Sequence, residues 1–357
     1  MQLVATNLSL KLGKRRVLQR IDLEVPGGEI HALLGAAGSG KSLLVECLAG
    51  LRPYDEGEVF LRGEPLAGRK ALSRLGVVFA QPNFFSHLSM QRNLELALAR
   101  RAESENAIHH TCERLRISHL LGALPGDLTS WQGLQMQLAR ALLNEPDALA
   151  LDVPFEQIPA GYHNTLRILL AEEAARGTAV LFTTSLPRQA QLAAGKIALL
   201  EQGAIVQYAT PREFYSAPQS LFVANVFFDQ GFGVIPGVIS KRLKNAFDCT
   251  LVGEFEVRIP CPKSKLLDFS GAEVLLGAHS GRIGFSQPDE PAIAVKGRHI
   301  LSREPGDCHI SLWRLGNGTI LEARTSETYQ GATRSELWIG VKGLVVFDEY
   351  GSTLACL

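Results

Sequence analysis

One eight-residue stretch limits the possible folds of this chain more than any other feature. Residues 35–42 match the pattern GxxxxGK[ST] in full. An apolar run over 29–34 precedes the stretch and helical spacing follows it, which is the strand, turn and helix that the pattern requires. Its glycines let backbone N–H groups turn toward phosphates, and the following helix presents its positive end. The stretch therefore predicts a phosphate-binding loop in an α/β layer fold.

Each residue of this loop is a candidate nucleotide contact. The loop consists of Gly35, Ala36, Ala37, Gly38, Ser39, Gly40, Lys41 and Ser42. Lys41 is expected to neutralise the β and γ phosphates, and the Ser42 hydroxyl to bind Mg²⁺. A second magnesium ligand is expected at Asp152, because an acid that ends the apolar strand 149–151 can complete the shell through water.

The chain reads as two domains. Its 357 residues compare with about 150 per domain. Strands alternate with helices up to about residue 230, interrupted by helical periodicity from about 85 to 145, which predicts an α/β domain with a helical subdomain. Residues 231–357 are rich in short β runs between turns, as in a small barrel or sandwich. The expected runs are 233–239, 249–259, 273–276, 320–323 and 337–341.

Composition excludes some classes of function. Lys plus Arg and Asp plus Glu both number 36, so the formal net charge is zero. A neutral chain lacks the positive field that nucleic-acid backbones require, so no nucleic-acid partner is expected. No apolar run approaches the roughly 18–20 residues of a membrane span, and the first residues lack a signal peptide's apolar core. Six scattered cysteines without a CxxC pair favour a reducing compartment, the cytoplasm.

The order of these pieces resembles the ATP-binding subunit of an ABC transporter. Residues 1–230 resemble its nucleotide-binding domain. Within them, the segments 202–207 and 210–215 also resemble that domain. Residues 231–357 resemble the OB-like regulatory domain of importer subunits. The resemblance implies ATP and Mg²⁺ as ligands, and a second ATPase subunit and transmembrane permease subunits as partners. It also implies a peripheral place on the cytoplasmic face of the inner membrane, with membrane contact only through the permease.

The signature segment departs from this family. Such domains hydrolyse ATP as a pair, each site using one chain's phosphate loop and the other's signature, LSGGQ. Here Leu138–Leu142 reads LARAL and sets the register, so that Leu128–Gln132 reads LTSWQ. Two glycines have become Ser130 and Trp131. A close approach of backbone to the γ-phosphate requires small residues, and we expect the indole to obstruct it.

The groups that would cleave ATP are also replaced. The family places a glutamate after the magnesium aspartate, whereas this chain has Val153, which can neither accept a proton nor polarise water. Glu156 lies near in sequence, but we expect the turn at Pro154 to direct it elsewhere. The family's switch histidine corresponds to Ser185. Three further family positions are also changed: the aspartate of the next loop to Pro159, the adenine-stacking aromatic to Leu12, and the glutamine after Phe79 to Ala80, with Gln81 one step late.

These departures predict a subunit that binds ATP but hydrolyses it poorly, paired with a competent ATPase subunit of a bacterial importer. Residues 222–237 resemble subunits for carbohydrates or polyols such as glycerol, and importers of ferric iron or polyamines remain open. A different class, a non-catalytic regulatory or scaffolding protein, is the alternative. Phe84 and Phe85 are expected to form part of the groove that receives a permease helix.

Overall fold

The computed structural model describes residues 2–66, 74–98, 104–228, 231–243, 246–251, 255–260, 271–304, 308–326, 329, 331 and 334–357. These residues form two compact units, Met1–Pro211 and Arg212–Leu357. The domain boundary expected near residue 230 falls at 229–230, outside the described residues, and stays a prediction.

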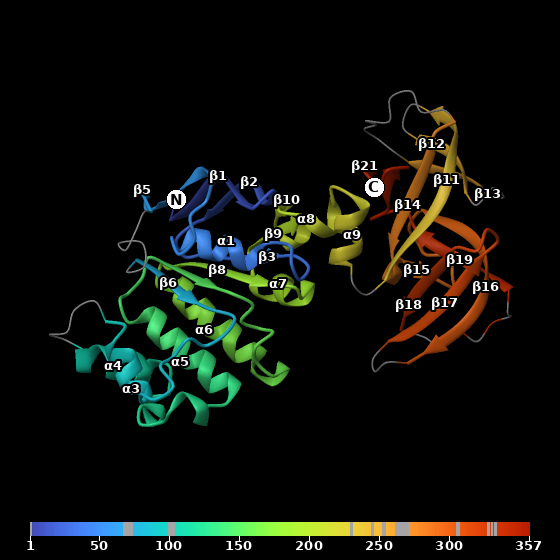
Figure 1. The fold of residues 1–357 in the computed structure, drawn as a ribbon. Helices are drawn as coiled ribbons and strands as arrows, with labels where there is room; N and C mark the ends of the chain where they lie inside the picture. The colour runs from blue at the N-terminus through green and yellow to red at the C-terminus, as the bar shows by residue number, and fades with distance from the viewer. Residues whose placement is uncertain are drawn as a thin grey trace. The chain divides into compact units, whose positions relative to one another are not determined.

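A largely parallel sheet forms the centre of the first unit (Figure 1). Its strand order is β10-β9-β3-β8-β7-β6, in which only β10 runs antiparallel to its neighbour. Every residue of β7 and β8 is buried, as expected for strands covered on both faces. The bounds are β3 Ile30–Leu34, β6 Leu75–Val78, β7 Ala148–Leu151, β8 Ala179–Thr184, β9 Lys196–Glu201 and β10 Ala204–Ala209.

Helix α1 (Lys41–Leu48) lies between this sheet and a second, antiparallel sheet of order β2-β1-β4-β5. Its Leu44, Val45 and Leu48 share one apolar core with both sheets. Helices α6 (His163–Ala175) and α7 (Pro187–Ala193) pack on the opposite face of the parallel sheet (Figure 1). The antiparallel strands are β1 Leu3–Leu12, β2 Arg15–Val25, β4 Glu56–Leu61 and β5 Glu64–Pro65.

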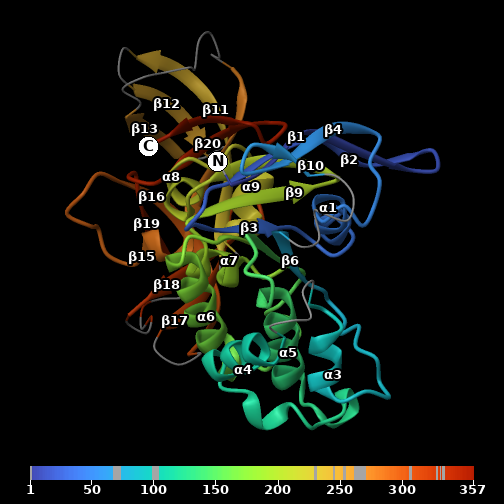
Figure 2. The same ribbon diagram turned by 90° about the vertical axis from the view of Figure 1, so that its left-hand side faces the viewer.

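The expected helical subdomain is present within the first unit (Figure 2). Its elements are α3 Met90–Glu95, α4 Ser104–Arg114, the 3₁₀ turns Ser118–Leu120 and Pro125–Asp127, and α5 Ser130–Leu142. Ser89 caps α3 by accepting from Arg92 N–H, and Thr129 caps α5 in the same way from Gln132 N–H. Each cap satisfies one N–H group at a helix start and so sets where that helix begins.

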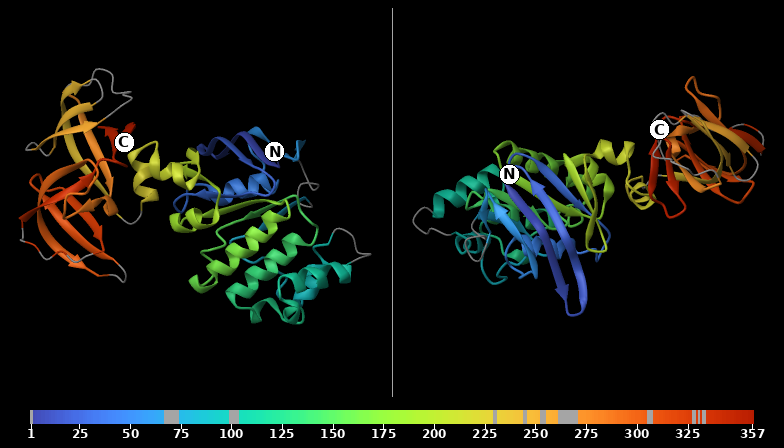
Figure 3. Two further views of the ribbon diagram at one scale, coloured as in Figure 1. Left: turned by 180° about the vertical axis from the view of Figure 1, so that it is seen from behind. Right: turned by 90° about the horizontal axis from the view of Figure 1, so that it is seen from above.

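The second unit carries α8 (Pro211–Ser216), α9 (Leu221–Phe227) and two antiparallel sheets around one apolar core (Figure 3). The strand orders are β13-β12-β11-β14-β20-β21 and β15-β19-β16-β17-β18. This is the nearly closed, barrel-like β domain that the OB-like expectation describes, and together with the α/β core it confirms the predicted fold class. The bounds are β11 Phe232–Leu243, β12 Ala246–Leu251, β13 Phe255–Pro260, β14 Glu273–His279, β15 Ile283–Gly284, β16 Ala292–Arg303, β17 His309–Leu315, β18 Ile320–Thr325, β19 Arg334–Gly340, β20 Val345–Asp348 and β21 Thr353–Cys356.

One predicted strand of this unit is wrong. Residues 249–259 do not form a single run, because β12 and β13 pair antiparallel, with Cys249 opposite Val257. The sequence pattern did not show that the chain changes direction between β12 and β13, because apolar residues occur in both strands.

The parallel strands bring distant parts of the sequence to one edge. The segments that follow β3, β7 and β8 all leave the carboxyl edge of the sheet, where α/β proteins bind ligands. Across the described part of the chain, no helix combines the length and apolar character needed to cross a bilayer.

Candidate nucleotide site

The loop between β3 and α1 has the backbone of a phosphate cradle. Gly38 and Gly40 adopt φ of 79° and 109°, in the left-handed region where a side chain is strained. At Gly35 a Cβ atom would lie 2.6 Å from the Leu200 carbonyl oxygen and 2.7 Å from Ser39 Oγ. The sequence therefore has glycine at the three positions where this loop excludes other residues.

Lys41 folds back over the loop. Its Nζ donates hydrogen bonds to the carbonyl oxygens of Gly35, at 2.7 Å, and Ala36, at 2.8 Å. Burial lowers the pKa of the Lys41 ammonium from its ordinary value, while the negative charges of Glu156 and Asp152 act in the opposite direction. The loop thus holds a positive charge at the place where the sequence predicts β and γ phosphates.

Two further loop residues fit a bound phosphate and metal. Ser39 Oγ is buried and has no hydrogen-bond partner among the described residues. A phosphate oxygen would give this hydroxyl the partner that buried polar groups normally have. Ser42 follows Lys41 on the first turn of α1, with its side chain exposed to an incoming Mg²⁺.

Asp152, the other expected magnesium ligand, comes directly after β7. It is buried, and its Oδ1 accepts a hydrogen bond from Thr183 Oγ1 at 2.7 Å. The backbone N–H of Asp152 donates to Val78 O on β6. The strand order β3-β8-β7 brings Asp152 to the same edge as the loop, with only β8 between them.

Val153 follows with an unusual backbone. Its φ is 43°, in the left-handed region that β-branched residues rarely enter. Its N–H donates to Thr183 Oγ1 at 2.8 Å, so one threonine hydroxyl holds both Asp152 and Val153 in place. The role of Thr183 was not anticipated from the sequence, where it is one of two threonines that end an apolar strand.

The expectation that Glu156 points away from the site is wrong. Its Oε1 accepts hydrogen bonds from Thr184 Oγ1 at 2.8 Å, Ser185 N at 2.6 Å and Ser185 Oγ at 3.1 Å. The turn that contains Pro154 therefore returns the chain to the end of β8, next to Ser185. Gln157 closes the turn by donating to Asp152 O at 2.8 Å.

Trp131 also lies elsewhere than expected. Its side chain is only 8% exposed, and its ring stacks on that of Tyr162, with centroids 5.1 Å apart. The indole is therefore buried against the 3₁₀ turn Ala160–Tyr162 and does not project from the start of α5. Thr129 and Gln132 close that end in a capping box, in which Thr129 N donates to Gln132 Oε1 at 2.9 Å.

The segment with the expected permease groove is held by a buried asparagine. Asn93 accepts from Phe85 N–H at 2.7 Å through Oδ1 and donates through Nδ2 to Phe85 O, Leu88 O and Ser89 O. Phe85 is 56% exposed, and the Arg140 guanidinium lies 4.8 Å from the centre of the Phe84 ring. Beside them is a cavity of about 300 Å³, lined in part by Leu51, Phe79 and Arg140.

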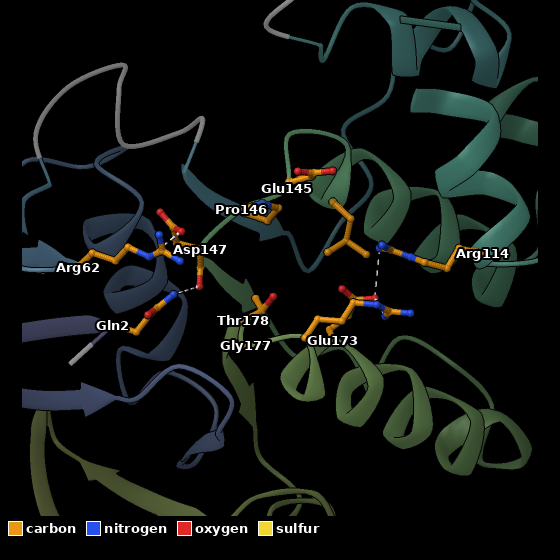
Figure 4. A pocket seen from close by; sticks show the side chains of 11 residues that line it. Gln2, Arg62, Arg114, Glu145, Pro146, Asp147, Glu173, Gly177 and Thr178 are labelled. Carbon is orange, nitrogen blue, oxygen red and sulfur yellow. Dashed lines mark hydrogen bonds and ion pairs between the residues drawn. The ribbon is translucent and has the colours of Figure 1, made fainter. Parts of the chain in front are cut away.

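Another cavity, of about 340 Å³, opens at the opposite edge of the sheet, where β7 and β8 begin (Figure 4). Two ion pairs line it, Arg62 with Asp147 at 2.9 Å and Arg114 with Glu173 at 3.2 Å. This cavity lacks the loop and the residues predicted to bind a nucleotide.

The chain was also compared with known proteins. A family model described as ABC transporter matches residues 18–156. The sulfate/thiosulfate import ATP-binding protein CysA of Nephroselmis olivacea is 32% identical over 229 residues, 62% of this chain and 67% of that protein. CysA of Caulobacter vibrioides is 31% identical, over 62% of this chain and 69% of that protein. The maltose/maltodextrin import ATP-binding protein MalK of Vibrio parahaemolyticus is 29% identical, over 61% and 60%.

A solved structure described as the ATP-binding subunit of an ABC transporter is similar in fold, with a TM-score of 0.55 and 22% identity, over 60% of this chain and 92% of that chain. The similarity in sequence and in fold agrees with the geometry of the site, which has a glycine-rich loop, a buried lysine and an aspartate after β7. This chain belongs to the family of ABC transporter ATP-binding proteins.

Proposed function

We propose that the chain is the ATP-binding subunit of a bacterial ABC importer, and that it binds ATP with Mg²⁺ but hydrolyses it poorly. The observation that carries the proposal is the pairing of a complete cradle, with Lys41 buried in it, and a valine after Asp152. Gly35–Ser42 would hold the phosphates, and Ser42 and Asp152 the metal. Bound Mg²⁺ would neutralise phosphate charge.

The proposed partners are a second, competent ATPase subunit and the transmembrane permease, at the cytoplasmic face of the inner membrane. This chain's loop would hold ATP against the partner's signature segment. The partner's own loop would face Thr129–Gln132, whose capping box already uses the threonine hydroxyl and the backbone N–H groups of Thr129 and Gln132. Turnover of the pair is therefore expected to be slow.

The proposed cargo is a carbohydrate or polyol such as glycerol. Support comes from the likeness of residues 222–237 to subunits of such importers, and one relative carries a maltose/maltodextrin name. Other relatives carry sulfate/thiosulfate names, so an anion is the competing cargo, and ferric iron and polyamines stay open. A regulatory or scaffolding pseudo-ATPase is the alternative function, and an intact cradle argues against it.

Capture of the partners tests this function. The tagged chain is expressed in its native cells and purified from their membranes. A permease and a second ATPase subunit are expected to co-purify with it. Phe85→Ala should abolish capture of the permease, because an exposed aromatic suits a helix-in-groove contact. Ile168→Ala is the control, since Ile168 on α6 is 60% exposed. Capture of neither partner by the wild-type chain would favour the scaffolding alternative.

A further inference from the structure

The ends of β7 and β8 hold two carboxylates, and neighbouring threonines position both. Thr183 Oγ1 donates to Asp152 Oδ1 at 2.7 Å, and Thr184 Oγ1 donates to Glu156 Oε1 at 2.8 Å. Asp152 is the expected metal ligand. Glu156 is a second acid at this edge, and neither the family's motifs nor the sequence pattern gives it a role.

Glu156 is fixed in place although its side chain is exposed. Besides Thr184, the N–H and the hydroxyl of Ser185 donate to the same oxygen, Oε1, at 2.6 and 3.1 Å. Three donors on one oxygen leave the carboxylate little freedom to move away from the end of β8. The carboxylate is therefore held at this edge of the sheet.

This part of β8 is bonded directly to the phosphate loop. The N–H of Gly35 donates to Thr184 O at 3.2 Å, so the residue that holds Glu156 also contacts the first glycine of the cradle. Burial lowers the pKa of the Lys41 ammonium, and the negative charges of Glu156 and Asp152 both act to raise it. Through Thr184, Glu156 is therefore held at the same edge of the sheet as the loop whose lysine would attract the terminal phosphates.

We infer that Glu156 is a specificity-determining residue: its charge lowers the affinity of this loop for nucleoside triphosphates and leaves the affinity for diphosphates nearly unchanged. The inference rests on the proposed function, because it requires a nucleotide in the cradle. A triphosphate brings additional negative charge to the same edge as the fixed carboxylate, and like charges repel even near the protein surface. A diphosphate lacks the phosphate that meets this repulsion.

Calorimetry of the full-length chain with Mg²⁺ and either ADP or the imido analogue of ATP tests the inference. Glu156→Gln is expected to strengthen binding of the triphosphate analogue about tenfold and of ADP by less than about twofold. Glu156→Asp keeps the charge and should bind like the wild type. Glu172→Gln is the matched control: it removes an exposed charge from the end of α6, at the opposite edge of the sheet, and should change neither affinity.

Three results would overturn the inference. In the first, Glu156→Gln changes both affinities by the same factor or leaves the triphosphate affinity unchanged. In the second, Glu156→Asp behaves like Glu156→Gln, so that charge is not the cause. In the third, no nucleotide binds to the wild type or to Glu156→Gln; this would also refute the proposed function, whereas the first two would leave it standing.

Discussion

Two sets of residues in the first unit match the expected motifs to very different extents. The phosphate cradle, meaning 35–42 with Asp152, retains its full pattern, its left-handed glycines and its buried lysine. The proposed cleavage positions, meaning 129–132, 153 and 185, are those where the sequence departs from the motifs that the resemblance implies. Binding a nucleotide depends on the backbone shape of the loop and on a few charges. Cleaving the nucleotide depends in addition on particular side chains, such as a general base.

The largest effect is expected from restoring the cleavage positions. Val153→Glu combined with Ser185→His should raise ATP turnover of the assembled complex about 100-fold, because a positioned general base contributes roughly 10²–10⁴-fold. Phosphate release from the reconstituted complex is the measurement. The control is Val153→Gln with Ser185→His, which has a similar shape but no base. An unchanged rate in the glutamate variant would mean that cleavage fails for another reason.

Removing the charge of the cradle should have the next largest effect. Lys41→Ala is expected to weaken binding of Mg²⁺-ATP about 30-fold, since hydrogen bonds to charged groups contribute about 1.5–3 kcal/mol. Lys196→Ala, at the start of β9 on the opposite edge, serves as the control. Equal affinities of Lys41→Ala and wild type, measured by calorimetry, would show that the nucleotide does not bind in this loop.

Helix α5 contains a buried side-chain amide that has no hydrogen-bond partner among the described residues. Gln137 on α5 is 0% exposed, and neither its Oε1 nor its Nε2 has a hydrogen-bond partner among the described residues. Gln137→Leu should therefore raise the free energy of unfolding by about 1–2 kcal/mol. Gln135→Leu should lower it, because Gln135 Nε2 donates to Leu115 O. Denaturant titrations that give both variants the same sign would contradict this assignment.

The smallest expected effect is a change in the free energy of unfolding caused by the backbone conformation of Val153. Val153 has φ of 43°, a conformation that asparagine tolerates better than a β-branched residue. Val153→Asn should raise the free energy of unfolding by roughly 0.5–1 kcal/mol, measured by the same titrations. Val77→Asn, in β6, should lower it. Destabilisation by Val153→Asn would mean that the packing of the valine outweighs its strain.

Much of the fold could be predicted from the sequence because local signals were strong. The glycine pattern and the apolar runs before it and at 148–151 located the loop and its sheet. The strands of residues 231–357 were harder to predict. Strands 292–303 and 309–315 were not predicted, because charged and polar residues interrupt their alternation. The antiparallel pairing of β12 with β13 was missed, because the residues of both strands were read as one run.

The site was predicted only where a motif describes it. The positions of Lys41 and Asp152 follow from spacing, but the hydrogen bonds of Thr183, Thr184 and Glu156 depend on a turn and a strand that lie about 30 residues apart. Burial of Trp131 depends on Tyr162, which comes from another element. Such contacts arise from tertiary packing, and no local pattern in the sequence indicates them.

We propose that this chain holds ATP without cleaving it, and bound nucleotide and released phosphate can be measured together to test this. Purified chain is incubated with Mg²⁺ and radiolabelled ATP, and bound nucleotide and released phosphate are measured in the same sample, beside Lys41→Ala. We predict bound ATP in the wild type, little in Lys41→Ala, and the same background phosphate release in both. Phosphate release by the wild type that Lys41→Ala abolishes would contradict the account.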